Sequence, residues 1–229
     1  MIVINPNKQE TITVNGVTYS RFAIKTHVIT KDDSIEEAVE KYAKPHLQTG
    51  DIVFISEKAV ACTESRAIPL IDIKPRKLAV FLSRYVQKTK HGIGLGMPET
   101  MEMALRECGI LRILFAAGIS VVGKILGQKG WFYHIAGDKA RSIDGPCPNT
   151  LPPYNKYVVL GPKNPMKTAK NIADRMGYGV AIVDINDLGS NILGHSNIKL
   201  SVETLGQILK DNVLGQSGEC TPMGILRKH

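Results

Sequence analysis

Residues 180–183, Val-Ala-Ile-Val, form an apolar, β-branched run that ends abruptly in an acidic, polar segment. A run of this length and composition predicts a buried strand. The segment that follows, residues 184–191, holds Asp184, Asn186 and Asp187. Carboxylates placed where a buried strand ends are suited to binding a hard cation. The alternative is an Asx-rich turn in which these side chains only satisfy backbone amides.

The composition indicates a globular chain with a substantial core. Of the 229 residues, 43% are hydrophobic, which suits either one large domain or two connected lobes. The formal net charge is +8, but the lysines and arginines are dispersed and only 6% of residues are aromatic. Binding of single-stranded nucleic acid needs aromatics interleaved with basic residues, so we expect no nucleic-acid partner. The charge suits small anionic ligands such as nucleotides, or it belongs to a solvated basic face.

The most apolar stretch, residues 110–127, is interrupted by Arg112 and Lys124. It predicts a core helix, or a strand and a helix, rather than a membrane span. The start of the chain lacks the regions of a secretory leader, so we expect a cytoplasmic protein without a membrane partner. The four cysteines are far apart in sequence, which predicts reduced thiols rather than a zinc site or disulfides.

Helix and strand signals alternate along the chain, as in an α/β protein. Asn15-Gly16 between two short β-rich runs predicts a hairpin. Ser34 opens a capping box and predicts a helix to about Leu47. Helices with proline first and glycine after the last turn are predicted from Pro98 to Gly109 and from Pro165 to Met176. We also predict strands at 52–55, 131–135, 157–160 and 223–226, helices at 77–86 and 201–213, and a loop with a lobe boundary near residues 145–156.

Two glycine-containing motifs are candidates for phosphate binding. Residues 118–125 come within one residue of a P-loop, but Ile125 stands where a Ser or Thr would reach the metal, and the apolar sequence favours a packed helix. Residues 92–96, Gly-Ile-Gly-Leu-Gly, follow Lys90-His91 and precede Pro98. They predict a turn whose amides lie near a helix start, which suits an anion, although such a turn often serves backbone geometry alone.

Four separated segments together resemble the coenzyme F-420-0:γ-glutamyl ligase family. They are residues 50–66, with Glu57-Lys58 and Glu64-Ser65-Arg66; residues 90–92, Lys-His-Gly; residues 183–189, Val-Asp-Ile-Asn-Asp-Leu-Gly; and residues 211–227, with Leu-Gly-Gln, Pro222 and an apolar end. The resemblance spans roughly residues 25 to 227 in the family's order. After His91 the chain departs from the family's polar segment, and Glu99 or Glu102 is the carboxylate available in place of a metal-binding aspartate.

The resemblance implies an α+β fold of mixed sheets with flanking helices, in which residues 1–229 form one γ-glutamyl-ligase-like domain of two intimately connected lobes. It also implies a homodimer. The implied reaction joins L-glutamate to a small F-420-0-like acid through an acyl phosphate, using GTP or another nucleoside triphosphate and Mg²⁺ or Mn²⁺. A non-catalytic nucleotide- and metal-binding protein of the same fold is the alternative function.

The resemblance assigns a role to each matching residue. The metal ligands would be Asp184, Asn186, Asp187 and Glu219. The catalytic candidates would be Lys58 and His91. The nucleotide-binding set would be Ser56, Lys58, Arg66, His91, Gly92, Gly94 and Gln216. These residues are widely separated in sequence, so the proposal requires the fold to bring them together.

Overall fold

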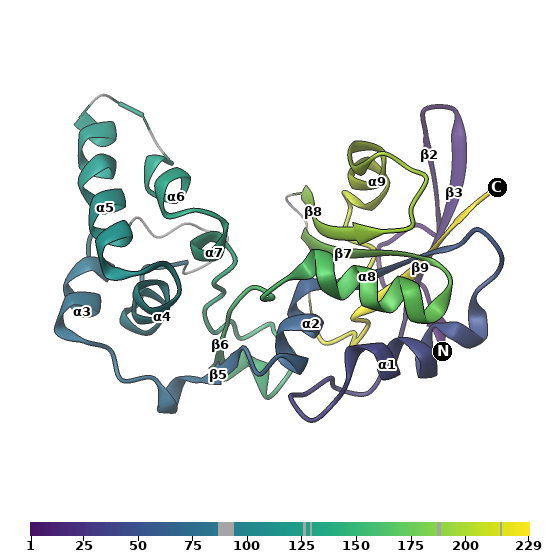
Figure 1. Ribbon diagram of the computed structural model, residues 1–229, viewed down its shortest axis with the longest axis horizontal. Helices are drawn as coiled ribbons and strands as arrows, with labels where there is room; N and C mark the ends of the chain where they lie inside the picture. The colour runs from purple at the N-terminus through teal and green to yellow at the C-terminus, as the bar shows by residue number, and fades with distance from the viewer. Residues whose placement is uncertain (87–93, 126, 129, 187–188, 216) are drawn as a thin grey trace. The chain divides into compact units, whose positions relative to one another are not determined.

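A computed structural model describes residues 1–86, 94–125, 127–128, 130–186, 189–215 and 217–229. The chain divides into two compact units (Figure 1). The sheet unit comprises Met1–Ser65 and Pro162–His229, and the helical unit comprises Arg66–Gly161. Each unit is built around buried hydrophobic residues of its own. We expected a lobe boundary near residues 145–156, whereas the units divide at 65/66 and 161/162. The prediction that all 229 residues form one family domain stays a prediction.

The sheet unit contains a mixed sheet in the order β1-β3-β9-β4-β7-β8, with β2 paired to β3. The strands are β1 (Ile2–Val3), β2 (Thr11–Val14), β3 (Val17–Ile24), β4 (Ile52–Ser56), β7 (Gly179–Asn186), β8 (Gly189–Ser196) and β9 (Met223–Lys228). Strands β4 and β7 are parallel, and the other pairs are antiparallel. The strand predicted from residues 180–183 is therefore confirmed, and it lies inside the sheet.

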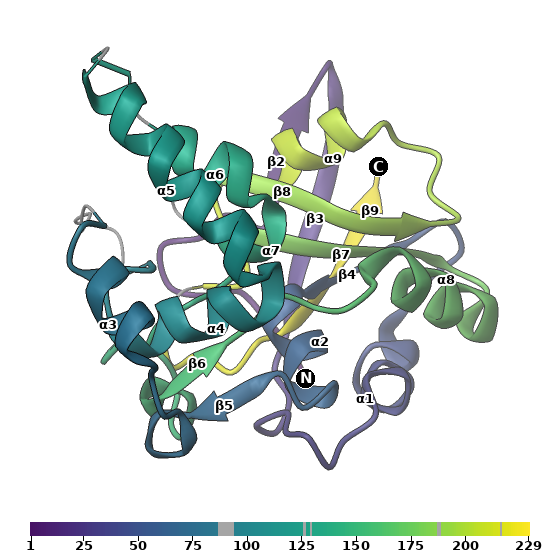
Figure 2. The same cartoon turned by 60° about the vertical axis from the view of Figure 1, so that its left-hand side comes forward.

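Helices cover both faces of this sheet (Figure 2). On one face lie α1 (Ile35–Tyr42), α2 (Glu57–Thr63) and α8 (Pro165–Met176), and on the other lies α9 (Val202–Leu209). A short 3-10 helix, Lys44–His46, follows α1. Because both faces are covered, the central strands are apolar at nearly every position, as the sequence of β7 shows.

Local signals in the sequence explain several element boundaries in the sheet unit. Asn15 and Gly16 adopt φ values of 51° and 76°, as the two-residue hairpin turn between β2 and β3 requires. The Ser34 hydroxyl accepts a hydrogen bond from the Glu37 backbone N–H at 3.3 Å and caps α1. Helix α8 begins at Pro165 and ends before Gly177, which has φ 74°. These three predictions are confirmed, although α1 ends at Tyr42 rather than near Leu47.

The helical unit contains α3 (Lys77–Ser83), α4 (Pro98–Cys108), α5 (Ile110–Ile125), α6 (Trp131–Ala136) and α7 (Asp138–Arg141). A two-stranded antiparallel sheet, β5 (Ala67–Pro69) and β6 (Tyr157–Val159), and the 3-10 helices Leu70–Asp72 and Tyr154–Lys156 complete it. Its core includes Met101, Leu105 and Ile113, none of which is more than 2% exposed. The predicted helix from Pro98 is confirmed, with Gly109 at φ 85° after its last residue.

Three sequence predictions require correction. Residues 131–135, predicted as a strand, form helix α6, which is bounded by Gly130 and Gly137 at positive φ and packs along α5. The segment 184–191, predicted as a loop, belongs largely to a hairpin, because β7 continues to Asn186 and β8 begins at Gly189. Residues 110–125 do form a helix, α5, but several of its apolar side chains are exposed rather than in the core.

None of the helices in the described part of the chain has the length and apolar character needed to cross a bilayer. The cytoplasmic location stays a prediction.

Candidate functional site

One edge of the sheet gathers candidate residues from three separate segments. Ser56, the last residue of β4, lies beside Val183 in the parallel strand β7, and β7 continues past this point to Asn186. The Ser56 backbone N–H donates to the Pro222 carbonyl at 2.8 Å, which places the start of β9 at the same edge. We call this region the β4–β7 edge. The fold therefore brings Ser56, Asp184 and the segment after Glu219 to one place.

The direction of Asp184 and Asn186 follows from the pleat of β7. Val180 and Ile182 belong to the core beneath α1, α2 and α8, whereas Ala181 and Val183 belong to the core beneath α9. Because successive strand residues point to opposite faces, Asp184 and Asn186 both lie on the α1–α2–α8 face. Both are partly buried. Their two oxygen-bearing side chains thus lie on one face of one strand, and Asp187 lies outside the described residues.

Strand β8 fixes the hairpin that carries these residues. Asn191 lies opposite Asp184, and Gly189 lies opposite Asn186. The Ser190 hydroxyl donates to the Gly206 carbonyl at 2.6 Å, which ties the start of β8 to α9. The hairpin is thereby anchored at the end nearest the β4–β7 edge.

Helix α2 begins directly at this edge. Ser56 is its N-cap residue, although its side chain makes no capping hydrogen bond, and Glu57 and Lys58 form its first turn. Glu57 is only 5% exposed, whereas Lys58 is exposed. A buried residue followed by an exposed one is what the first turn of a helix on the sheet surface produces. Lys58 therefore lies on the solvent side of this turn.

A network of buried polar residues holds the segment that leads to Glu219. The Arg21 side chain is 1% exposed and donates to the Ile208 carbonyl at 2.9 Å and to the Asp211 carboxylate. Asn5 donates to the Val213 carbonyl at 3.0 Å and to the Thr221 hydroxyl at 2.9 Å. Arg21 and Asn5 thus both donate to acceptors of this segment, although the buried Arg21 Nε has no hydrogen-bond partner among the described residues. Sequence reasoning missed Arg21 and Asn5, because nothing local to either residue indicates such a distant partner.

Gly215 and Glu219 fit together in this segment. A Cβ atom on Gly215, which has φ 79°, would lie 2.8 Å from the Glu219 carboxylate carbon. Glu219 can therefore occupy this place only because residue 215 is glycine. Its carboxylate accepts a hydrogen bond from the Ser217 backbone N–H at 2.7 Å. Gln216 lies outside the described residues.

Comparison with protein-family models adds the deciding observation. The model described as F420-0:Gamma-glutamyl ligase matches residues 23–206. The chain belongs to the F420-0:γ-glutamyl ligase family. The match covers β4, β7 and the helical unit, and it stops before Gly215, Glu219 and β9. No curated protein matches the chain in the corresponding search. The family predicted from four short segments is confirmed, together with the α+β fold of a mixed sheet and flanking helices.

In this γ-glutamyl ligase family member, the predicted phosphate ligand Arg66 already has partners. Its Nε donates to the Gly161 carbonyl, and its Nη2 lies 2.5 Å from the Glu107 carboxylate. The side chain is 12% exposed. Two residues earlier, the Glu64 carboxylate accepts a hydrogen bond from the Lys163 backbone N–H at 2.6 Å. The Glu-x-Arg part of the motif thus binds the chain where it returns from the helical unit, and phosphate binding by Arg66 stays a prediction.

Of the candidate residues in the helical unit, Gly94 is described, and His91 and Gly92 lie outside the described residues. Gly94 has φ 50°, and a Cβ atom there would lie 2.9 Å from the Tyr133 hydroxyl. Burial raises the pKa of the Tyr133 phenol, against the smaller effect of a backbone hydrogen bond at Leu95. Gly94 is therefore closely packed against a phenol that remains protonated at neutral pH.

Glu102, one of the two carboxylates after His91, is held by two arginines. It is 1% exposed and accepts hydrogen bonds from Arg76 Nε at 3.0 Å and from Arg106 Nε at 2.8 Å. Burial alone would raise the pKa of this carboxyl, but the hydrogen bonds and charge of Arg76, with Arg106, lower it below its ordinary value. Glu102 therefore joins α3 to α4 as an anion, and Glu99 is the more accessible carboxylate for a ligand.

The described side-chain donors would fit a Mg²⁺ or Mn²⁺ ion only where waters or substrate phosphates supplied the other ligands. Within the described ranges, no three His, Cys, Asp or Glu side chains lie together as a metal-binding group. Mg²⁺ is commonly held by one or two carboxylates together with waters and substrate phosphates. Asp184 and Asn186, on one face of β7, are oxygen donors of the kind that such an ion takes.

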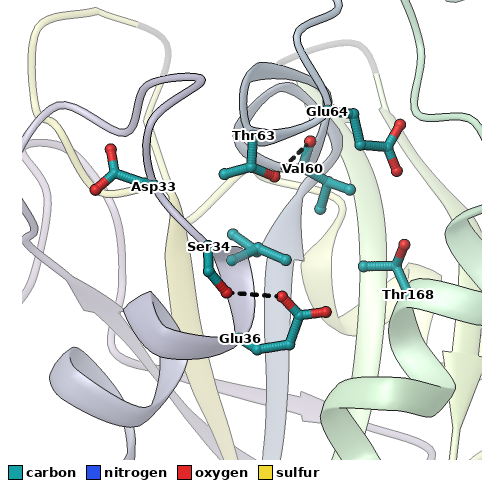
Figure 3. A pocket seen from close by; sticks show the side chains of 8 residues that line it. Asp33, Ser34, Glu36, Val60, Thr63, Glu64 and Thr168 are labelled. Carbon is teal, nitrogen blue, oxygen red and sulfur yellow. Dashed lines mark hydrogen bonds between the residues drawn. The ribbon is translucent and has the colours of Figure 1, made fainter.

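A polar pocket of the sheet unit is formed by residues at the start of α1, in and after α2, and in α8 (Figure 3). It encloses about 200 Å³ and is lined by Asp33, Ser34, Ile35, Glu36, Val60, Thr63, Glu64 and Thr168. Three carboxylates and three hydroxyls give it an acidic character that disfavours phosphate. None of the predicted site residues lines it. The β4–β7 edge therefore remains the candidate site for an anionic nucleotide.

Proposed function

We propose that this chain is a nucleotide- and divalent-metal-dependent ligase that joins a small, F-420-0-like acid to L-glutamate. Family membership supports γ-glutamyl ligase activity in general. The observation that carries the proposal is the convergence of Ser56 and Asp184 at the β4–β7 edge, with the exposed Lys58 in the adjoining first turn of α2. Acidic and basic groups beside one another are what binding of a metal–triphosphate requires.

The chemistry begins from an unreactive carboxylate. A carboxylate becomes an acyl donor when the terminal phosphoryl group of a nucleoside triphosphate is transferred to one of its oxygens, which releases the diphosphate. The amine of L-glutamate then attacks the acyl carbon, the C–N bond forms, and inorganic phosphate leaves. Holding the acid, the triphosphate and the amine in line lowers the entropic cost of both steps.

In this proposal the chain's own residues bind and orient charge. Lys58 and His91 contact the transferring phosphoryl group, and Ser56, Gly92, Gly94 and Gln216 contribute to nucleotide binding. Asp184, Asn186, Asp187 and Glu219 are the proposed oxygen ligands of a Mg²⁺ or Mn²⁺ ion, which when bound screens the triphosphate charge. The electrostatic role of Lys58 is greatest in the transition state, where charge develops on the phosphoryl oxygens.

The proposal is tested by following phosphate release from GTP, and separately from ATP, with Mn²⁺, L-glutamate and an F-420-0-like acid. We expect release only when both the acid and L-glutamate are present. Asp184→Ala is expected to lower kcat/KM by about 100-fold or more, because it removes a metal ligand. Asp174→Ala, which removes an exposed carboxylate on α8 in the same unit, is the matched control and should leave the rate unchanged.

The alternative, a non-catalytic nucleotide- and metal-binding protein, gives a different result in the same samples. It would show thermal stabilisation by nucleotide and Mn²⁺ that Asp184→Ala abolishes, without phosphate release. The absence of both stabilisation and turnover, with GTP and with ATP, would contradict both functions.

We also propose that the chain works as a homodimer. Sedimentation equilibrium of the purified protein over a wide concentration range tests this separately from the reaction. A mass that stays at that of one chain would contradict the dimer and leave the ligase proposal to its own assay.

A further inference from the structure

Residues 213–221 carry Glu219, and the two ends of this segment are joined through one buried side chain. We call the segment the Glu219 loop; its described residues are 213–215 and 217–221. Asn5, which follows β1 and is 5% exposed, donates from its amide nitrogen to the Val213 carbonyl at 3.0 Å and to the Thr221 hydroxyl at 2.9 Å. An asparagine amide has two N–H donors, so Asn5 can use one for each end of the loop.

The Thr221 hydroxyl closes the same loop a second time. It donates to the Leu214 carbonyl at 2.7 Å while it accepts the hydrogen bond from Asn5. Thr221 is 5% exposed. A hydroxyl group can donate one hydrogen bond and accept another at the same time, so this buried oxygen connects Asn5 with both ends of the loop. Tying the ends of a loop reduces the number of conformations open to the residues between them.

Contacts inside the loop then set the place of the Glu219 carboxylate. On one side, the Gly215 N–H donates to the Asn212 carbonyl at 3.0 Å, and the Asn212 side chain donates back to the Gly215 carbonyl at 2.9 Å. On the other side, the Thr26 N–H donates to the Cys220 carbonyl at 3.1 Å. Gly215 and Cys220 are therefore both held, and the Glu219 side chain packs against the first of them.

The closed end of the loop adjoins the candidate site. Thr221 directly precedes Pro222, whose carbonyl accepts the hydrogen bond from the Ser56 N–H at the β4–β7 edge. A shift of Thr221 therefore changes where the loop, with Glu219, lies relative to that edge. The hydrogen bonds of Asn5 and Thr221 thus act where the loop is attached to the sheet.

A simpler role for these two side chains is to provide donors for the carbonyls of two buried residues, Val213 and Leu214. Several directional bonds do more than that, because each tolerates a narrow range of distance and angle, whereas apolar contact is non-directional. The chain of bonds from Asn5 through Thr221 to Leu214 has this property. It also encloses a loop that carries a predicted metal ligand.

We propose that Asn5 and Thr221 are positioning residues that hold the Glu219 carboxylate where a Mg²⁺ or Mn²⁺ ion binds. Neither side chain contacts the ion; both act through the closed ends of the Glu219 loop. The inference rests on the proposed function, because it takes Glu219 to be an oxygen ligand of the metal. Asn5 and Thr221 both lie outside residues 23–206, which the family model matches.

Binding of Mn²⁺ alone, measured from the electron paramagnetic resonance signal of the free ion, tests the proposal without turnover. Thr221→Val keeps the shape of the side chain but removes the hydroxyl, and we expect it to raise the Mn²⁺ dissociation constant by about 10-fold. Thr221→Ser keeps the hydroxyl and should bind Mn²⁺ as the wild type does. Asn5→Ala, which removes both donors, should weaken binding by about 10-fold or more. Should Asn5→Ala not fold, the two variants at Thr221 decide the question.

A double-mutant cycle separates action through Glu219 from a general loss of structure. Glu219→Ala should weaken Mn²⁺ binding by itself. Adding Thr221→Val to it should cause no further loss, because two changes that act through one ligand are not additive. Additive losses would show that Thr221 acts on another part of the protein and would overturn the proposal.

Arg227→Lys is the control for a loss of stability alone. The Arg227 guanidinium joins β9 to Asp51, directly before β4, by hydrogen bonds of 2.9 Å and 2.7 Å. These bonds lie at the opposite end of β4 from Ser56. Arg227→Lys should lower the melting temperature, as Thr221→Val does, but it should leave Mn²⁺ binding unchanged. Circular dichroism verifies that each variant is folded.

The outcomes distinguish this inference from the ligase proposal. If Glu219→Ala weakens Mn²⁺ binding whereas Thr221→Val and Asn5→Ala do not, the positioning role is wrong and the metal ligand stands. If the wild type does not bind Mn²⁺, or if Glu219→Ala binds it equally well, both the ligand and its positioning residues are wrong. A protein that shows the expected Mn²⁺ pattern but releases no phosphate would contradict the ligase reaction alone.

Discussion

Strand β7 and helix α5 begin from similar sequence information and end in different surroundings. Both contain an apolar run, of four residues in β7 and of most of the helix in α5, and both suggested a core position when read from sequence. In β7, Val180 through Val183 are all 0% exposed, because α-helices cover both faces of the sheet. In α5, one face is buried and the other meets water. Apolar content thus indicates that a segment must be covered, but the number of neighbours in the same chain determines whether it is.

The largest expected effect contrasts truncation in the two segments. Ile182→Ala in β7 should lower the free energy of unfolding by about 2–5 kcal/mol, because it leaves a cavity between covered faces. Leu111→Ala in α5, where the side chain is 84% exposed, should change it by less than about 0.5 kcal/mol. Urea unfolding monitored by circular dichroism measures both. Similar losses at the two positions would show that α5 is covered within the chain and would break the comparison.

Acidification tests the hydrogen bonds between Glu102 and the two arginines, Arg76 and Arg106, which stabilise the helical unit in addition to its apolar core. The pKa of Glu102 is lowered in the folded chain, so its contribution to stability is fully present above the ordinary carboxyl pKa and is lost as the pH falls through the lowered value. Glu102→Gln should cost about 2 kcal/mol near neutral pH, since it weakens charged hydrogen bonds to two half-exposed arginines. The difference in stability between the wild type and Glu102→Gln should become smaller below about pH 4. Melting temperatures of both proteins across this range measure it, and a constant difference would contradict the lowered pKa.

A glycine-to-alanine substitution should change the free energy of unfolding in opposite directions in the two units. In β8, a Cβ atom on Gly194 would lie 2.4 Å from the Pro165 backbone, so Gly194→Ala should destabilise by about 1–3 kcal/mol. In α5, Gly118 has open space around it, and Gly118→Ala should stabilise by about 0.5–1 kcal/mol. Gly189→Ala in β8, which meets nothing within 4 Å, is the control for the steric effect. Urea unfolding of each variant would contradict this account if Gly194→Ala were neutral.

The smallest expected effect concerns the junction between the two units. Ser65 has φ 57°, a conformation that is unfavourable for residues other than glycine. Ser65→Gly should raise the free energy of unfolding by about 0.5–1 kcal/mol, with the gain reduced by the greater freedom of glycine in the unfolded chain. Thermal unfolding compared with Ser65→Ala, which retains a Cβ atom, measures it. A destabilised Ser65→Gly variant would mean that the serine contributes more than strain.

The sequence predicts the sheet unit better than the helical unit, for physical reasons. Signals such as Asn15-Gly16, Ser34 and Pro165 act over a few residues, and the structure uses each as expected. The aromatic run from Trp131 instead depends on packing against α5, which its own residues do not encode. In the candidate site, the parallel pairing of β4 with β7 aligns Ser56 with Val183. That alignment is a long-range contact, so the sequence alone supplies the residues and not their proximity.

The end contacts of the helical unit have a consequence for how the chain folds. Its first and last residues, Arg66 and Gly161, are joined by a hydrogen bond, and the Leu160 N–H donates to the Arg66 carbonyl. Pairing β4 with β7 closes a long loop, which has an entropic cost. Because the ends of the helical unit are already joined by its own hydrogen bonds, the pairing of β4 with β7 does not have to offset that whole cost. The helical unit thereby holds together the two chain ends that lead to β4 and β7. Changes of length within the helical unit can be tolerated without changing the strand register around Ser56.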